Sequence, residues 1–323
     1  MQRFNFIYHG NTNPYFNLSM EEYLLTKKTD SFICLWKNSP SVIVGVNQNT
    51  LEEVNLAFTQ KNDIKVIRRQ TGGGAVYHDL NNICYTVIAP FEHSENSYIK
   101  FASPIIEYLK TLGVNAEFSG RNDILIEGKK ISGNAQKIVG NRIIQHGTLM
   151  FNTDVDMLTN SLKVNKLKIQ SKGIKSVKSR VTNISNYVDI DATTFFNGLV
   201  EFVKKDCIPY TLTEEDIKGI NQLIESKYSK DLWNIGYSPK GKNSFSYKFN
   251  FGLLNLNFDS VEGKIFNLNI YGDFFTNRDI KEFSKSLEGV QFNYKSLLLA
   301  FERISDYIVG ANGKEIIDKL FDE

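Results

Sequence analysis

The segment 68–79 carries the clearest chemical pattern in the chain, Arg-Arg-Gln-Thr-Gly-Gly-Gly-Ala-Val-Tyr-His-Asp. Three successive glycines after a β-rich run allow positive φ angles and bring backbone N–H groups close to a ligand, which suits phosphate and other anions. Arg68 and Arg69 add permanent positive charge in a forked geometry that matches carboxylate or phosphate. The pattern indicates an anionic ligand. A tight hairpin turn with solvated arginines is the alternative, and the spacing fits neither a P-loop nor a Rossmann fingerprint.

Lys130 is the second candidate, in the segment Gly-Lys-Lys-Ile-Ser-Gly-Asn at 128–134. If Ile131 faces the core, strand alternation places Lys130 on the opposite face, where it is available to a site. A lysine there could stabilise negative charge that develops on a carboxylate or phosphate oxygen. The alternative is a hairpin whose lysines keep an edge strand soluble.

His146, which precedes Gly147 and Thr148, is more often a structural hydrogen-bonding group than a base in such a setting. The other histidines share no metal-ligand spacing with it, so no zinc site is expected. Mg²⁺ would instead arrive with a nucleotide and need one carboxylate, such as Asp123. Cys34 and Cys84 lie in apolar strand-like runs, where a thiol is inert.

The segment 163–180 holds seven basic residues and no acidic one. Such a run is usually a solvated surface, although it could fold over a phosphate-bearing intermediate. Nucleic-acid binding is the weaker option, because the run contains no aromatic residue for stacking.

Composition describes a globular protein of about two domains, with 323 residues, 41% hydrophobic content and a net charge of +2. The near balance of charge argues against a nucleic-acid or membrane partner. Three scattered cysteines predict a reducing, cytoplasmic location, and no apolar run approaches the roughly 18 residues that span a bilayer.

The elements that would position these residues alternate between strands and helices. A helix is expected after Asn13, with a capping box that begins at Ser19, and a hairpin is expected around Asn38-Ser39-Pro40. Short strands separated by glycines follow at 117–151 and predict antiparallel pairing. A cluster of Gly, Pro, Ser and Lys before residue 240 marks a boundary, after which the pattern predicts three strands and two helices.

Four motifs occur in one order between residues 68 and 184: RRQTGGGAVYHD, RNDILIEGKKISGNAQ, QHGTLMFN and SKGIKSVKSRVTNI. Together they resemble the lipoate-protein ligase A family of the biotin/lipoate ligase superfamily. NPYFNLSMEEYLL and SPSVIVGVNQNTLEE extend the resemblance toward the N-terminus. WNIGYSP and GKIFNLNIYGDFF resemble the family's C-terminal accessory domain.

The resemblance implies an α/β (α+β) catalytic domain at 1–240, with mixed, largely antiparallel sheets and flanking helices, and a small α/β accessory domain at 241–323. It also implies a reaction in which lipoate and MgATP form lipoyl-AMP. The lipoyl group then passes to a lysine on lipoyl domains of 2-oxoacid dehydrogenase E2 subunits or on the glycine cleavage H protein. Lipoate is distinguished only poorly from octanoate by burial of an acyl chain.

By the same resemblance, Lys130 and Asp123 are catalytic, with Asp123 the candidate Mg²⁺ ligand. The implied residues that bind ATP and the lipoyl-adenylate are Arg69, Thr71, Gly72, Gly73, Gly74, Ala75, Val76, His78, Asn122, Asp123, Lys130, Ser132, Gly133, Ala135, His146, Gly147, Thr148, Lys172 and Gly173. Val46 and Gln145 depart from the family pattern. Two other functions remain open: an octanoyl or lipoyl transferase that needs no ATP but does need an activated cysteine, and a non-catalytic module that binds phosphate or nucleic acid.

Overall fold

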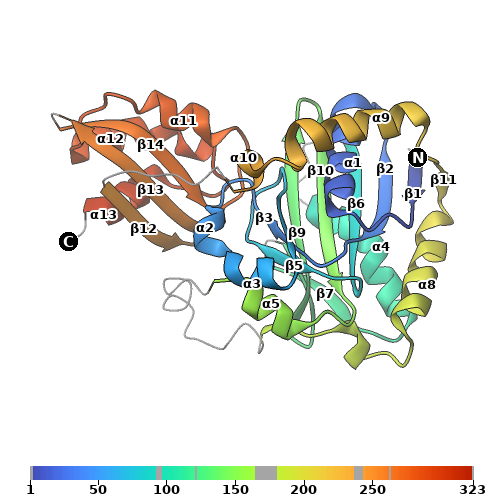
Figure 1. Cartoon of the computed structure of the whole chain (residues 1–323). Helices are drawn as coiled ribbons and strands as arrows, with labels where there is room; N and C mark the ends of the chain where they lie inside the picture. Colours follow the sequence, from blue (N-terminus) through green and yellow to red (C-terminus); the bar gives the residue numbers. More distant parts are fainter. Residues whose placement is uncertain are drawn as a thin grey trace.

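The computed structural model describes residues 3–91, 97–120, 122–163, 180–235, 243–261 and 263–321. These residues form an eight-stranded sheet and two three-stranded sheets, with helices packed on their faces (Figure 1). Most strand pairs are antiparallel, and the parallel ones are β1 with β2, β1 with β11 and β3 with β4. The predicted α/β class with mixed, largely antiparallel sheets is confirmed.

The eight-stranded sheet forms one wall of the cavity that holds the candidate site. Its strands lie in the order β11-β1-β2-β6-β10-β9-β8-β7. Their bounds are β1 Phe4–Tyr8, β2 Phe32–Lys37, β6 Asn82–Pro90, β7 Ala116–Ser119, β8 Asp123–Ile126, β9 Lys129–Val139, β10 Arg142–Met150 and β11 Cys207–Pro209.

Two pairs of helices cover the faces of this sheet. Helices α4 (Ser97–Thr111) and α8 (Ala192–Lys204) bury apolar side chains against one face. Helices α1 (Pro14–Lys27) and α9 (Glu214–Leu223) pack on the other. Both faces of the sheet are therefore covered by helices, which accounts for the continuous apolar run of the central strand β6.

Helix α1 begins directly after Asn13, as the sequence predicted. Asn13 is its N-cap and accepts a hydrogen bond from the backbone N–H of Tyr15, while Pro14 occupies the first turn. A proline there is pre-organised for the helix and lacks only an N–H that would have no partner. The capping box predicted at Ser19 is wrong, because Ser19 is buried inside the helix.

A small sheet of β4 (Lys65–Arg68), β3 (Ser41–Val44) and β5 (Val76–His78) faces α1 and the large sheet. The hairpin predicted around Asn38 is wrong, since β2 and β3 belong to different sheets. Contacts with the segment before and within α1 hold the connection between β2 and β3 in place. Asn38 is buried against the side chain of Asn17, and Ser39 N–H donates to Thr12 O. Three short helices flank this sheet: α2 Thr50–Glu53, α3 Leu56–Lys61 and α5 Val155–Ser161.

The C-terminal part has its own sheet and its own apolar core. Its elements are β12 Asn243–Phe249, β13 Gly252–Val261, β14 Lys264–Gly272, α11 Ile280–Ser286, α12 Tyr294–Ala300, the 3-10 helix Phe301–Asp306 and α13 Gly313–Phe321. The three predicted strands are present, and the structure adds a third α-helix to the two predicted. The boundary predicted at residue 240 falls in 236–242, outside the described residues.

Three remaining elements connect the layers: the 3-10 turn Ile184–Asn186, the π-helical turn Ile224–Tyr228 and α10 Asp231–Asn234. No helix within the described ranges is both long enough and apolar enough to cross a bilayer.

Candidate active site

A cavity of about 150 Å³ lies between the large sheet, the small sheet and α1. Residues from β2, β3, β5, β6, β9 and β10 line it, so the fold brings together segments that are far apart in sequence. Thirteen of the predicted binding residues are among the lining: Arg69, Gly73, Gly74, Ala75, Val76, His78, Asn122, Lys130, Gly133, Ala135, His146, Gly147 and Thr148.

One row of opposed residues crosses the floor of this cavity. Trp36 on β2 pairs with Cys84 on β6, and Cys84 pairs with Thr148 on β10. Thr148 in turn faces Gly133 on β9, whose N–H lies 3.3 Å from Thr148 Oγ1, and Gly133 pairs with Asp123 on β8. Because opposed residues share a face of the sheet, the row runs from an apolar end at Trp36 to a charged end at Asp123.

Lys130 and Asp123 form the charged end. Lys130 Nζ lies 2.7 Å from Asp123 Oδ1, and about a third of each side chain is exposed. A methyl group on Gly133 would lie 2.8 Å from Lys130 Nζ, so the ammonium group sits directly over this glycine. Ile131 is fully buried while Lys130 lines the cavity, which confirms the predicted alternation.

Arg69 is buried and directs its hydrogen bonds at the protein. Its guanidinium group donates to Thr71 Oγ1 and to the backbone oxygens of Ile43, Gly72 and Gly74. Burial lowers the pKa of Arg69 to about 10, which still leaves it charged near neutral pH. Arg69 therefore fixes the shape of the triple-glycine loop, and its positive charge lies next to the loop backbone.

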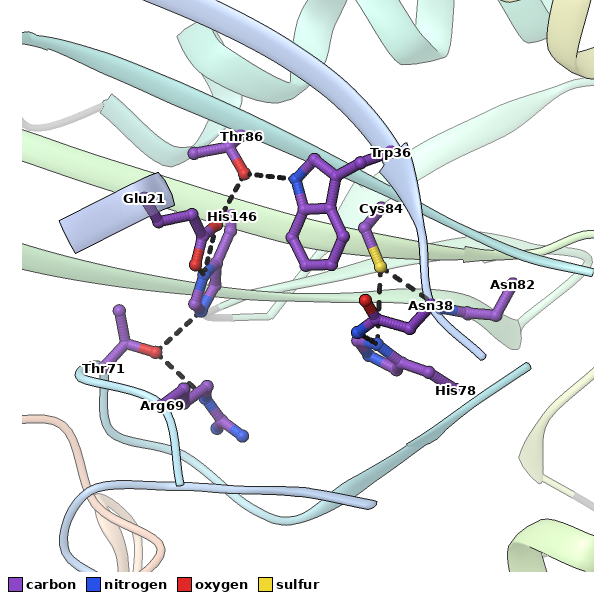
Figure 2. A network of polar contacts seen from close by, with 10 residues as sticks. All are labelled: Glu21, Trp36, Asn38, Arg69, Thr71, His78, Asn82, Cys84, Thr86 and His146. Carbon is purple, nitrogen blue, oxygen red and sulfur yellow. Dashed lines mark hydrogen bonds and ion pairs between the residues drawn. The ribbon is translucent and has the colours of Figure 1, made fainter. Parts of the chain in front are cut away.

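A chain of hydrogen bonds joins this loop to α1 (Figure 2). Thr71 Oγ1 lies 2.7 Å from His146 Nε2, and His146 Nδ1 lies 3.0 Å from both carboxylate oxygens of Glu21. Glu21 also accepts a hydrogen bond from Thr86. Glu21 is buried, and no motif pointed to it because nothing in its local sequence separates it from other helical glutamates.

His78 and Cys84 form part of the apolar end. Both are almost fully buried, and His78 Nδ1 lies 3.5 Å from Cys84 Sγ. Burial, assisted by the charge of Arg69, lowers the pKa of His78 to about 3, and burial raises the pKa of the Cys84 thiol well above its usual value. Both effects favour the neutral forms, and Cys84 lies in a buried strand, as the sequence predicted. Burial raises the pKa of Cys34 as well.

The C-terminal part touches the triple-glycine loop directly. Gly73 N–H lies 3.4 Å from Phe274 O, and a methyl group on Gly72 would lie 2.5 Å from the same oxygen. A second contact joins Gly272 N–H to Asn47 O at 2.6 Å. The Phe274 contact braces the triple-glycine loop, and the Gly272 contact braces the segment that follows β3.

Several predicted residues lie outside the cavity lining. Thr71 is bonded to His146, and Asp123 forms an ion pair with Lys130. Gly72 packs against Phe274. Ser132 is buried and accepts a hydrogen bond from Asn134. The other two, Lys172 and Gly173, fall in 164–179, outside the described residues.

The sequence prediction missed the apolar lining, Leu18, Trp36, Ile43 and Cys84, together with Asn134. Apolar residues in separate strands look the same whether they line a cavity or fill a core.

Within the described ranges, no group of three His, Cys, Asp or Glu side chains could hold a metal ion. Asp123 offers a single, partly exposed carboxylate. That donor set fits Mg²⁺ bound mainly by phosphate oxygens and water, and it does not fit a protein-ligated transition metal.

The comparisons with known proteins agree with this geometry. Residues 13–204 match the lipoyl protein ligase A/B catalytic domain, and residues 238–320 match the bacterial lipoate protein ligase C-terminus. The chain is 42% identical to lipoate-protein ligase LplJ of Bacillus subtilis, over 98% of this chain and 97% of that protein. It is 41% identical to lipoate–protein ligase 1 of Staphylococcus aureus, over 94% of each.

Solved structures show the same fold. LipL1 of P. falciparum in complex with lipoate has a TM-score of 0.77 and 28% identity, over 98% of this chain and 97% of that one. A bipartite archaeal lipoate protein ligase from Thermoplasma acidophilum, described with its E2 lipoyl domain, has a TM-score of 0.67 at 28% identity, over 75% and 100%. A lipoate-protein ligase A bound with ATP has a TM-score of 0.65 at 27% identity, over 72% and 99%. The family match, the full-length relatives and the cavity lead to one conclusion: the chain belongs to the lipoate-protein ligase family.

Proposed function

We propose that this ligase activates lipoate with MgATP and transfers the lipoyl group to a lysine of a lipoyl domain. The single observation that carries the proposal is the position of the Lys130 ammonium group. It lies over Gly133 at the charged end of a cavity whose other end is apolar. That arrangement suits a fatty acid whose carboxylate reacts at Lys130 while its chain lies along the sheet.

Activation is required because a carboxylate does not acylate an amine at a useful rate near neutral pH. In the first step, a carboxylate oxygen of lipoate attacks the α-phosphorus of ATP, and the bond to pyrophosphate breaks. Negative charge grows on the phosphate oxygens as this happens. The Lys130 ammonium group and the backbone at Gly73 and Gly74 line the cavity, and we expect them to stabilise that charge.

In the second step, the amine of the acceptor lysine attacks the acyl carbonyl. The bond to AMP breaks, AMP leaves with the electron pair, and the nitrogen gives up a proton as the amide forms. Asp123 serves both steps by holding the Lys130 ammonium in place through their 2.7 Å ion pair. The same carboxylate would hold Mg²⁺ together with nucleotide phosphate oxygens, and the metal would supply further positive charge.

The acyl chain would occupy the apolar end of the cavity. Burying about seven carbons at about 0.8 kcal/mol each contributes roughly 5 kcal/mol before ordering costs. We assign this chemistry to residues 1–240 and treat 241–323 as an accessory domain. Phe274 and Gly272 of the accessory domain contact the glycine loop and Asn47.

The acceptor is a lipoyl domain of a 2-oxoacid dehydrogenase E2 subunit or the glycine cleavage H protein. The archaeal relative described with its E2 lipoyl domain supports this class of partner. Transfer without ATP is the competing function, and it needs an activated thiol. Cys34 and Cys84 do not fit that role, because burial raises the pKa of each thiol.

Mass spectrometry tests the proposal directly. A purified apo lipoyl domain is incubated with the ligase, lipoate and MgATP, and a matched reaction omits ATP. We expect a mass increase of one lipoyl group in the complete reaction alone. A lipoyl group that appears equally without ATP would reject ATP-dependent activation.

A further inference from the structure

Asn134 is a buried polar residue of β9 that bonds to the residue directly before β8. Its side chain is 2% exposed, and it follows Gly133, over which the Lys130 ammonium group lies. The backbone N–H and the side-chain nitrogen of Asn134 both donate to Asn122 O, at 2.8 and 3.2 Å. In return, the side-chain nitrogen of Asn122 donates to Asn134 O at 2.7 Å. Three hydrogen bonds therefore join this one pair of residues.

The contacts of Asn134 determine which way its amide points. Asn122 O is a backbone oxygen and can only accept, so the atom that faces it must be the side-chain nitrogen. That nitrogen also lies 3.3 Å from Ser132 Oγ. The side-chain oxygen points the other way, where it accepts hydrogen bonds from the buried Tyr85 hydroxyl and, at 3.4 Å, from Gln145 Nε2. Both ends of the amide are thus bonded, which gives the side chain one defined position.

Asp123 directly follows Asn122, so these bonds also hold its backbone. Asp123 is paired with Gly133 in the ladder between β8 and β9, and it forms the 2.7 Å ion pair with Lys130. Apart from that ion pair, Asp123 Oδ1 has no hydrogen-bond partner among the described residues. The position of this oxygen relative to the sheet therefore depends on the backbone that carries it.

The ladder between β8 and β9 is irregular within two residues of Asp123. The register shifts between Ile124 and Leu125, where β9 carries one extra residue. A β-bulge of this kind interrupts the ladder and re-aims the neighbouring side chains. It accounts for the position of Lys130 over Gly133, because residues three apart in a regular strand lie on opposite faces. The ladder therefore holds this end of β8 less firmly, and the bonds to the preceding residue hold it in addition.

Building on the proposed function, we propose that Asn134 is a positioning residue for adenylation, which holds the start of β8 so that Asp123 keeps the Lys130 ammonium group at the reacting phosphate. This role does not require contact between Asn134 and the substrate. A displacement of about 1 Å at a reaction centre can lower a rate by about a hundredfold. Loss of these bonds should therefore lower kcat, while the apolar end of the cavity, and with it the KM for lipoate, should change little.

The test is a kinetic double-mutant cycle between Asn134→Ala and Asp123→Ala, measured by lipoate-dependent pyrophosphate exchange. With Asp123 present, Asn134→Ala should lower kcat by about tenfold to a hundredfold and leave the KM for lipoate nearly unchanged. In the Asp123→Ala background it should have little further effect, because the carboxylate that it positions is absent. A residue that served the fold alone would lower exchange by the same factor in both backgrounds.

Tyr85→Phe is the matched control. It removes the hydroxyl that donates to the oxygen end of the Asn134 amide and leaves the bonds to Asn122 in place. Both variants break a buried hydrogen bond, so both should lower the urea midpoint of unfolding. Only Asn134→Ala should lower kcat strongly, and equal losses of kcat in the two folded variants would contradict the proposal.

Asn122→Ala examines the same bonds if Asn134→Ala does not fold. Asn122 is half-buried, so its substitution removes the bond to Asn134 O without opening the core. It should likewise lower kcat with Asp123 present and have little effect in the Asp123→Ala background. Wild-type exchange in a folded Asn134→Ala variant, or the same loss in both backgrounds in either cycle, would overturn the role of Asn134. A wild-type ligase without lipoate-dependent exchange would instead reject the proposed function.

Discussion

Nδ1 of His146 lies 3.0 Å from both carboxylate oxygens of Glu21, which ties strand β10 to helix α1 beneath the glycine loop. Through Thr71, the same imidazole is connected to the buried guanidinium group of Arg69. Burial opposes the charge of Arg69, and the nearby negative charge of Glu21 supports it by raising the pKa of the guanidinium group. The loop is therefore held by a compensated pair of buried charges linked by hydrogen bonds.

Glu21→Gln should weaken this arrangement without changing the shape of the side chain. The amide carries no charge to balance Arg69, and it cannot accept with both of its heavy atoms from His146. We expect a loss of about 2 kcal/mol in the free energy of unfolding, measured in urea. Lipoate-dependent pyrophosphate exchange should also fall by about tenfold, because the glycine loop is less well held.

Glu22→Gln is the matched control for that variant. Glu22 accepts hydrogen bonds from Lys227 and Tyr228, whereas Glu21 is bonded to His146. Glu22→Gln should lower stability to a similar degree while leaving pyrophosphate exchange near the wild-type rate. Equal losses of exchange in the two variants would show that Glu21 affects stability alone.

Lys130→Ala should keep the fold and lower adenylation by about a hundredfold to a thousandfold, the scale of losing a key charge-stabilising donor. Lys130 and Asp123 are each about one-third exposed, so breaking their ion pair should change the free energy of unfolding little. The neighbouring Lys129 is exposed, and Lys129→Ala provides the control. Pyrophosphate exchange at the wild-type rate in Lys130→Ala would reject its proposed role.

Local patterns predicted where several polar residues of the site lie. The triple glycine after a strand indicated a loop at a binding site, and Gly73 and Gly74 line the cavity; period-two alternation placed Lys130 opposite the buried Ile131. Both inferences depend on residues within one strand or turn. Local backbone chemistry is sufficient at such positions.

The remaining parts depend on contacts between distant segments. The chain after β2 leaves the large sheet because Asn38 is bonded to Asn17, 21 residues earlier, so the turn-like sequence there does not form a hairpin. Glu21 meets His146 across 125 residues. Such pairs exist only after the layers pack, and a single sequence carries no periodic signal for them.

Gly73 and Gly74 should respond differently to the same substitution. Gly73 has a φ of +89°, and an added methyl group would lie 3.1 Å from both an Arg69 guanidinium nitrogen and the Phe275 ring. Gly74 has no described atom within 4 Å of that position. Gly73→Ala should therefore cost about 1–2 kcal/mol in the free energy of unfolding through backbone strain and reduce pyrophosphate exchange, while Gly74→Ala should be stable. Equal urea midpoints for the two variants would contradict this account of the loop.

His78 should make the protein less stable as the pH falls. Its pKa is lowered to about 3 in the folded state by burial, whereas an exposed histidine has a pKa of about 6.5. Between these values the unfolded chain binds a proton that the folded protein does not, so stability decreases with decreasing pH. Relative to pH 7, this group should remove about 2 kcal/mol from the free energy of unfolding at pH 5. Urea unfolding at both pH values measures the loss, and His78→Phe should lose about 2 kcal/mol less than the wild type. An identical pH dependence in the two proteins would mean that His78 accepts a proton in the folded state.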